Sequence, residues 1–561
     1  MNIKKIQKSI FFILIINIVA HAQAFLDPQD DIYKYFDRWI TTGYVDFLPP
    51  LRPYPQEILE KGLLQVIERG DRQSRNKAKS FLEEIKKNDS SKYYNQEKEK
   101  QELEFSSPVF TPLAKALINI SDNDFFAISG AGFLLDYRLN SLIYAAADWS
   151  LLLVDKQNGE SLSSPSPPAR SKQLEGMAQP EYSGFPLDMV ADSSNMSIAG
   201  RTYYIKQSIH SIINMGDSRL YTQIGLVRSS FGPFFSESIV LSPSSQHAIR
   251  YNLVYYALGW TYSAIYMDLV ATNNIGEGAN TGKHLRINSL EWNIGKNIRA
   301  GLFETVLWGP DFNLYYLIPL GELTYQQIYA GAPDNSLFGL SLTVRTPYRF
   351  RYDIMLYVDD LEFYDLVKLN FNTLYKASIQ TAIKWVPLYK SLKDISLEYI
   401  LITPYMYTHK DSDTYNYLNY THDGLSLALQ LPPNSDRLML AATIEPLDWV
   451  TLSPKLSFTR HANASEGIAD IAYPADGSIF DAGYTTTGYP SFDAQPTRFM
   501  TQDTIEKTLE AGLDAGFAIE TESLDMKIEL AYKILYTWNY NLIAGNNKLQ
   551  NYISINSKIT W

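Results

Sequence analysis

One stretch near the C-terminus alternates between apolar and polar residues for longer than a soluble β-strand usually runs. From Leu524 to Trp538 every even-numbered residue is apolar or aromatic, and every charged residue is odd-numbered. Soluble strands average about 5–6 residues, whereas a membrane-crossing strand needs about 9–11. The apolar face ends on Tyr536 and Trp538, as an aromatic girdle would. The pattern therefore predicts a transmembrane β-barrel.

The last strand of the chain fits the same prediction. Ile553, Ile555, Ile559 and Trp561 alternate with polar residues in NYISINSKITW, and the chain stops on the tryptophan. We expect this strand to face lipid with its isoleucines and to close the barrel against a first strand near Phe110. The terminal aromatic resembles the signal that the barrel-assembly machinery reads, which predicts that machinery as a partner during biogenesis.

Connection lengths support a barrel over a soluble sandwich. Short connections at 445–448 and 521–523 alternate with long ones at 157–186, which is rich in Ser and Pro, and at 461–505. Outer-membrane barrels have short periplasmic turns and long external loops. Residues 106–561, at about 25 per strand and its share of loop, predict a barrel of about 18 antiparallel strands.

The N-terminus predicts export. Three lysines precede the apolar run 10–20, and Ala22-Gln-Ala24 follows. This is the pattern of a secretory signal peptide, here residues 1–24. No later stretch offers about 18 consecutive apolar residues. We therefore predict that the mature chain reaches the bacterial outer membrane and contacts its lipid.

Residues 25–105 are expected to form a small periplasmic helical region. Pro55 begins an apolar stripe of helical spacing, a second stripe follows Asp71, and a highly charged run covers 86–104. Helix-period stripes with a proline at the start predict helices. The helical pair at 55–87 is interpreted as a support for the barrel.

Composition and motifs argue against most enzyme classes. The chain has no cysteine and a formal charge of −12, which excludes thiolate chemistry and makes nucleic-acid binding improbable. It contains no H-E-x-x-H, G-x-S-x-G, P-loop or dinucleotide fingerprint. The prediction is a non-catalytic protein without cofactor or metal.

The densest carboxylate group in the barrel region is Asp359-Asp360, with Glu362 and Asp365 nearby. Two carboxylates could serve glycoside hydrolysis, or several could bind Ca²⁺. Adjacent strand residues point to opposite faces. A polar wall followed by a solvated turn is therefore the favoured interpretation.

The long loop 461–505 is the first choice for ligand binding, since aromatic faces pack on sugar rings and carboxylates accept from sugar hydroxyls. The equal alternative is that the loop folds back to plug its own barrel. Counting strands back from the C-terminus places this loop outside the cell, and the same count places Tyr415, Tyr417 and Tyr420 on the periplasmic side. The candidate sugar-binding residues are Tyr473, Asp476, Phe480, Asp481, Tyr484 and Tyr489.

Several stretches, taken in order, resemble the Wzi family of capsule-assembly outer-membrane proteins. The resemblance implies a barrel of about 18 strands with a small helical bundle below it, acting as a non-catalytic lectin that tethers capsular polysaccharide. The resembling stretches are Leu48–Leu63, Gly225–Pro243, Asn297–Pro310, Asn335–Phe363, Glu398–His409, Tyr420–Leu440 and Phe458–Asn463.

The expected function is therefore an outer-membrane barrel that binds or anchors surface polysaccharide. The alternative is a porin for small solutes. An acidic inner wall would mildly favour cations in such a porin. That wall is predicted to carry Glu510, Asp514, Asp525 and Glu529.

Overall fold

The computed structural model confirms a closed antiparallel β-barrel. It describes residues 27–87, 109–121, 125–138, 143–156, 194–198, 201–257, 259–273, 278–318, 334–360, 368, 375–409, 415–422, 425–463, 497–521 and 524–561. No helix within these ranges is long and apolar enough to cross a membrane. The signal peptide predicted at 1–24 and the predicted boundary at 105/106 lie outside the described residues.

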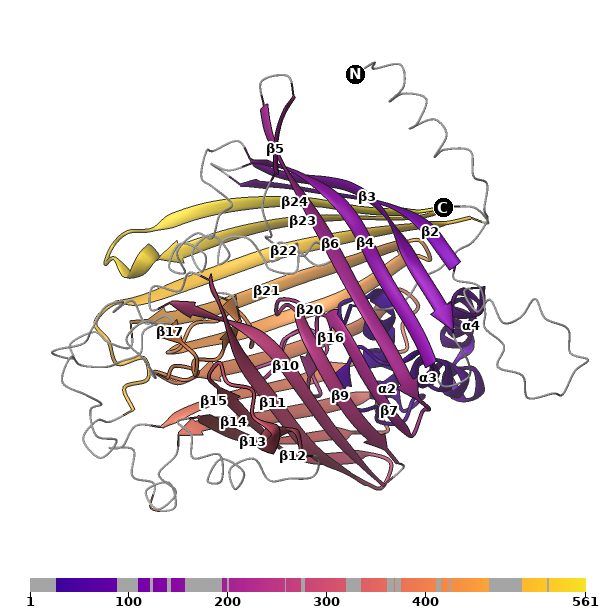
Figure 1. Cartoon of the computed structure of the whole chain (residues 1–561), viewed down its shortest axis with the longest axis horizontal. Coiled ribbons are helices and arrows are strands. Elements are labelled where there is room, and N and C mark those ends of the chain that lie inside the picture. Colours follow the sequence, from indigo (N-terminus) through magenta and orange to yellow (C-terminus); the bar gives the residue numbers. More distant parts are fainter. Residues whose placement is uncertain are drawn as a thin grey trace, which may run out of the picture.

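Eighteen long strands in the described ranges form the wall, each paired antiparallel with the next (Figure 1). The strands are β2 (Val109–Ser121), β3 (Phe125–Arg138), β4 (Ile143–Lys156), β6 (Arg201–Gly216), β7 (Leu220–Val227), β9 (Ala248–Tyr256), β10 (Trp260–Asn273), β11 (Gly278–Ile294), β12 (Ile298–Trp308), β13 (Asn335–Arg345), β14 (Phe350–Asp360), β15 (Lys376–Trp385), β16 (Leu392–Ile402), β20 (Ser435–Leu447), β21 (Val450–Ala462), β22 (Ile505–Glu520), β23 (Asp525–Trp538) and β24 (Lys548–Thr560).

The C-terminal strand closes the ring as predicted. β24 pairs with β2 from Thr560 opposite Leu113 to Tyr552 opposite Ser121. Ile553 and Trp561 are 43% and 41% exposed on the outer face, and Ser554 on the inner face is buried. The alternation read from the sequence therefore separates a lipid-facing side from a lumen-facing side.

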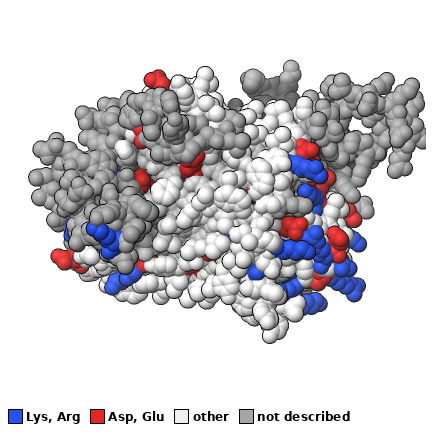
Figure 2. All heavy atoms as spheres, turned by 90° about the horizontal axis from the view of Figure 1, so that it is seen from below, with Lys and Arg blue, Asp and Glu red and all other residues white. Residues whose placement is uncertain are grey.

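The outer surface has the charge distribution of a membrane protein. In Figure 2 Lys, Arg, Asp and Glu gather at the right-hand end of the barrel, and a broad, largely uncharged band lies next to them. Large hydrophobic side chains stand exposed along many outward positions, including Leu302, Phe338, Leu440 and Leu513. An apolar band on a closed antiparallel barrel is the arrangement that spans an outer membrane, and the chain is an outer-membrane barrel.

Among the described residues, three helices lie at one end of the barrel, near the C-terminus (Figure 1). They are α2 (Asp31–Thr42), α3 (Gln56–Arg69) and α4 (Arg72–Lys87). The short connections 217–219, 295–297, 346–349, 386–391 and 448–449 lie at this end, because Arg345, Arg349 and Lys393 in or beside them contact the helical region or its partners. Since periplasmic turns are short, this is the periplasmic end.

The remaining elements are short. β1 (Leu51–Arg52) pairs with β8 (Ser230–Phe231) inside the barrel. Isolated pieces occur in the long connections, namely β5 (Ser194–Ile198), β17 (Tyr415–Asn416), β18 (Thr421–His422), β19 (Leu425–Ser426) and the 3-10 turns η3 (Leu314–Leu317) and η5 (Tyr540–Leu542).

Candidate functional site

The predicted sugar-binding residues are not placed by the structure. Tyr473, Asp476, Phe480, Asp481, Tyr484 and Tyr489 lie outside the described residues. The strands that flank their loop are placed: β21 ends at Ala462 and β22 begins at Ile505, opposite each other. Both ends lie away from the turn at Thr521, which is periplasmic. The loop therefore leaves the barrel at the external end, as predicted.

The carboxylate pair at Asp359-Asp360 ends strand β14. Asp359 is on the inner face of this strand and buried, beside Tyr407, which agrees with the polar wall expected from sequence. Glu362 and Asp365 lie outside the described residues. Within those residues no group of three or more His, Asp or Glu is arranged to hold a metal ion.

The predicted placement of Tyr415, Tyr417 and Tyr420 on the periplasmic side is wrong. β16 ends at Ile402 and β20 begins at Ser435, so both ends of this connection lie at the external end. The described residues between them form only the two-residue strands β17, β18 and β19, and none of these crosses the barrel wall. Tyr420 is fully buried inside the barrel.

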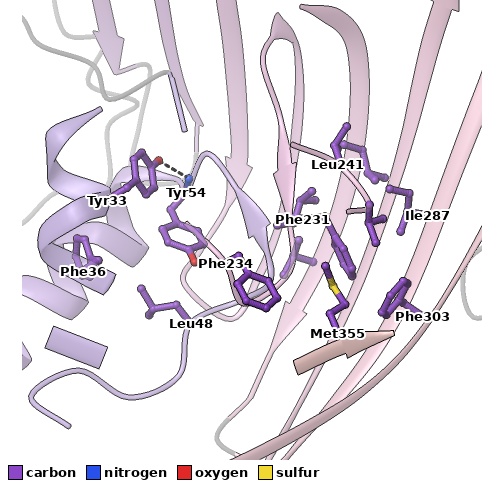
Figure 3. Packing of buried hydrophobic residues seen from close by; sticks show 14 of the residues in the cluster. Tyr33, Phe36, Leu48, Tyr54, Phe231, Phe234, Leu241, Ile287, Phe303 and Met355 are labelled. Carbon is purple, nitrogen blue, oxygen red and sulfur yellow. Dashed lines mark hydrogen bonds between the residues drawn. The ribbon is translucent and has the colours of Figure 1, made fainter. Parts of the chain in front are cut away.

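Three segments enter the lumen and form what we call the plug. They are residues 43–54 from the helical end, residues 228–247 between β7 and β9, and the described residues 403–409, 415–422 and 425–434 between β16 and β20. Together with the inner wall they build one buried apolar cluster, which includes Leu48, Phe231, Leu241, Tyr407 and Leu429. Figure 3 shows part of this cluster, with Phe231 and Met355 facing each other across the interior.

Hydrogen bonds join the three plug segments to one another. Arg52 is buried and donates to Ser230 Oγ at 2.8 Å and to the Phe234 carbonyl at 2.7 Å. The Gly232 amide donates back to the Pro50 carbonyl at 3.0 Å, and Gly232 adopts a φ of +110° that favours glycine. The Ser242 amide donates to Leu427 at 2.9 Å. The plug is one connected body.

Long side chains of the wall hold the plug by its backbone. Arg250 donates to the Arg52 carbonyl at 3.0 Å, Lys283 donates to the Asn419 carbonyl at 2.7 Å, and Arg299 donates to the Leu48 carbonyl. Buried carbonyls need such donors, and charged donors give the stronger hydrogen bonds. A cavity of about 40 Å³ remains beside Arg52, Glu291 and Arg299.

Helix α2 is fixed to the wall by two buried charge groups of opposite polarity. Asp37 pairs with Arg351 at 2.6 Å and with Lys384. The neighbouring Arg38 pairs with Asp394 at 2.5 Å and Glu445 at 2.7 Å. Burial alone would raise the pKa of Asp37, but the charges of Arg351 and Lys384 outweigh it and lower that pKa to about 2. The carboxylate is therefore ionised at neutral pH.

The inner wall at β21–β23 is less filled than the rest. Lys455 and Asp514 face inward and pair at 2.6 Å, yet their side chains are 31% and 32% exposed. Glu529, also on the inner face, is exposed. This side of the lumen therefore presents polar side chains to open space, and the predicted inward direction of Asp514 and Glu529 agrees with the structure.

Sequence reasoning missed the plug and the helix α2. The plug stretch Gly232–Leu241 contains apolar residues without a strand or helix period, so periodicity carries no signal there. One signal for inserted segments was available in the sequence, namely arginine and lysine at inward-facing positions of β12, β14 and β15. A buried cation needs a partner, so these residues predict that something polar enters the barrel.

Comparison with known proteins agrees with the barrel fold. No protein-family model matches the sequence, and no curated protein matches it. Among solved structures, the chain is similar to Wzi of Escherichia coli, an outer-membrane protein involved in group 1 capsule assembly and described as a carbohydrate-binding β-barrel. The identity is 9%, the alignment covers 96% of this chain and 99% of Wzi, and the TM-score is 0.54.

Weaker similarities are to channel-type barrels. OprD of Pseudomonas aeruginosa aligns over 81% of this chain and 94% of its own length, with 10% identity and a TM-score of 0.43. OccAB2 of Acinetobacter baumannii aligns over 81% and 98%, with 11% identity and a TM-score of 0.42.

Proposed function

We propose that this outer-membrane barrel binds or anchors a surface polysaccharide and catalyses no reaction on it. The plug is the observation that carries the proposal. A buried apolar cluster built from three inserted segments spans from the helical end toward the external loops, which suits a scaffold better than an open pore. The barrel of Wzi, a carbohydrate-binding protein, has a similar fold.

The long external connections are the proposed place of binding. Loops carried by a rigid scaffold are where binding residues usually lie, and here the scaffold is a wall braced from inside by the plug. The loop 461–505, with Tyr473, Asp476, Phe480, Asp481, Tyr484 and Tyr489, is the proposed sugar-binding segment. Its aromatic rings would stack on sugar faces, and its carboxylates would accept from hydroxyl groups.

Deleting residues 464–496 is expected to abolish glycan binding while the barrel still folds. The reason is that β21 and β22 pair along their whole length without this loop. A glycan array probed with the purified intact protein and the deletion variant measures the effect, and heat-modifiable electrophoretic mobility reports folding. Deletion of the Ser/Pro-rich segment 157–186 is the matched control and should retain binding. Failure of the intact protein to bind any glycan would contradict the proposal.

A solute channel is the second candidate, favoured by the polar side chains that face open space at β21–β23. Single-channel recording in planar bilayers separates the two functions. The plug predicts small or absent currents at moderate voltage, because apolar side chains and inserted backbone occupy much of the cross-section. Steady and large openings by the intact protein would favour the channel instead.

A further inference from the structure

A cluster of polar side chains faces outward from the barrel wall at β11 and β12. Trp292 and Leu302 are 37% and 50% exposed and identify the outward positions of these strands as the even-numbered ones. On the same face, Arg286 donates from Nε to Asn288 Oδ1 at 3.0 Å, and Asn288 donates to Glu304 Oε1 at 3.4 Å. Asn288 and Glu304 are directly opposite in the pairing of the two strands.

This cluster lies within the height of the apolar band. Asn288 is four residues along β11 from Trp292, which is about 13 Å at the rise of a β-strand. The apolar band of an outer-membrane barrel is about 25 Å tall. An arginine that faces lipid near mid-bilayer is strongly destabilising. Arg286 is only 1% exposed and Asn288 only 5%, so protein rather than lipid covers them.

Part of that cover is Tyr262 of β10, whose hydroxyl donates to Asn288 Oδ1 at 3.4 Å. The chain segment that follows β12 lies beside the cluster. Residues 309–318, which we call the strap, turn back onto the outer wall. Tyr316 is fully buried, and its ring lies 4.5 Å from that of Trp308. Both belong to one buried hydrophobic cluster with Val306, the residue of β12 that pairs with Arg286. The Phe312 ring lies edge-on to Tyr266, 6.1 Å away.

A polar contact at His284 fixes the start of the strap. His284 Nδ1 lies 2.8 Å from the Tyr266 hydroxyl and 3.3 Å from Asp268 Oδ1, and Nε2 lies 3.4 Å from the Pro310 carbonyl. Further along, the Asn313 side chain accepts from the Tyr315 amide at 3.0 Å and begins the turn η3. The strap therefore has a defined inner face against the wall.

The outer face of the strap is apolar. Phe312, Leu314, Tyr315 and Ile318 are 55%, 69%, 49% and 51% exposed. The strap contacts Tyr266 of β10, and the next strand is β9, whose Tyr251 pairs with Tyr266 and whose Ile249 pairs with Asp268. Ile249 is 56% exposed on the lipid-facing side. The strap contacts the wall at the level of these lipid-facing residues.

We propose that the strap is immersed in the external leaflet of the membrane, where its outer face contacts lipid acyl chains and its inner face helps to seal the Arg286–Asn288–Glu304 cluster from lipid. The partner is lipid hydrocarbon. Burying the four apolar side chains in acyl chains removes them from water, which is favourable in proportion to the apolar area buried. At β10–β12 the barrel therefore has two layers, the strands and the strap outside them. The polar side chains of the cluster form their hydrogen bonds within the protein.

The absence of cysteine from the chain makes the test direct. Leu314→Cys and, separately, Tyr315→Cys are labelled with the fluorophore NBD, and the protein is inserted into phosphatidylcholine vesicles with or without doxyl-labelled phosphatidylcholine. We expect doxyl lipid to remove most of the emission, to the extent seen with Ile249→Cys, a lipid-facing reference. Arg219→Cys, in the periplasmic turn between β6 and β7, should keep its emission.

Two results would overturn the proposal. Quenching by aqueous iodide without quenching by doxyl lipid would place the strap in water. Energy transfer between donor- and acceptor-labelled copies, with no lipid quenching, would show that a second copy of the chain covers the strap. Heat-modifiable mobility confirms that each labelled barrel is folded, and agreement between the two strap positions excludes an effect of one substitution.

Discussion

Replacing Asp37 with asparagine is expected to loosen helix α2 from the barrel. The substitution removes the partner of Arg351 and Lys384 in a buried site, where the Asp37–Arg351 pair closes at 2.6 Å. Removing one member of a buried ion pair costs about 3–5 kcal/mol when the remaining charge is left without compensation. Here Arg351 keeps Asp353 at 2.7 Å and Lys384 lies 4.0 Å from Asp394, so we expect a loss of no more than about 3 kcal/mol. Hydrogen exchange of the α2 amides, followed by mass spectrometry, should accelerate, whereas the amides of the barrel strands should not.

Lys34→Gln provides the matched control on the same helix. Lys34 pairs with Asp31, but the two side chains are 61% and 39% exposed, and surface pairs contribute about 0–1 kcal/mol. Equal exchange rates in the Asp37 and Lys34 variants would show that the buried charges do not fix α2.

The effect of Asp37→Asn should depend on pH. The folded-state pKa of Asp37 is about 2 and its ordinary value is 3.8. A depressed carboxyl pKa stabilises the folded state fully above the ordinary value, and this contribution is lost as pH falls through the folded-state value. The difference in unfolding free energy between wild type and variant should therefore be constant from pH 5 to 7 and should shrink between about pH 4 and 2.

The barrel wall was predictable because one physical rule determines it. In a membrane barrel each strand separates lipid from lumen, so period-2 alternation reports both the element and its orientation. This is why the face of Ile553 and Trp561, the closure near Phe110 and the number of strands agree with expectation. Connection length identified the two ends for the same reason, since turns and loops differ in length between the membrane sides.

The inserted parts were not predictable by the same rule. Alternation identifies which residues share a face but does not report what fills the space beyond that face. The stretch around Tyr420 alternates enough to suggest a strand, yet its partners are Tyr357 and Tyr407 inside the lumen. Arg286 shows the reverse case: its outward position follows from register, while its burial depends on side chains of the neighbouring strands, such as Asn288.

The plug and the wall pack directly against each other at Phe303. This residue lies on the inner face of β12, is 4% exposed, and its ring is 5.2 Å from Phe231 of the plug and 5.7 Å from Tyr357 of β14. It thus joins an inserted segment to two strands of the wall. Replacing it removes contacts on both sides at once.

Phe303→Ala is expected to destabilise the plugged barrel by about 3–5 kcal/mol, the usual cost of truncating a buried phenylalanine. Because the lost contacts are those between plug and wall, part of the loss should appear as brief openings in single-channel recordings that wild type lacks. Phe338→Ala is the matched control, since Phe338 is 50% exposed on the outer face of the neighbouring strand β13. It removes the same atoms from the lipid-facing side and should leave the current unchanged. Equal currents in both variants would mean that the plug does not close the lumen.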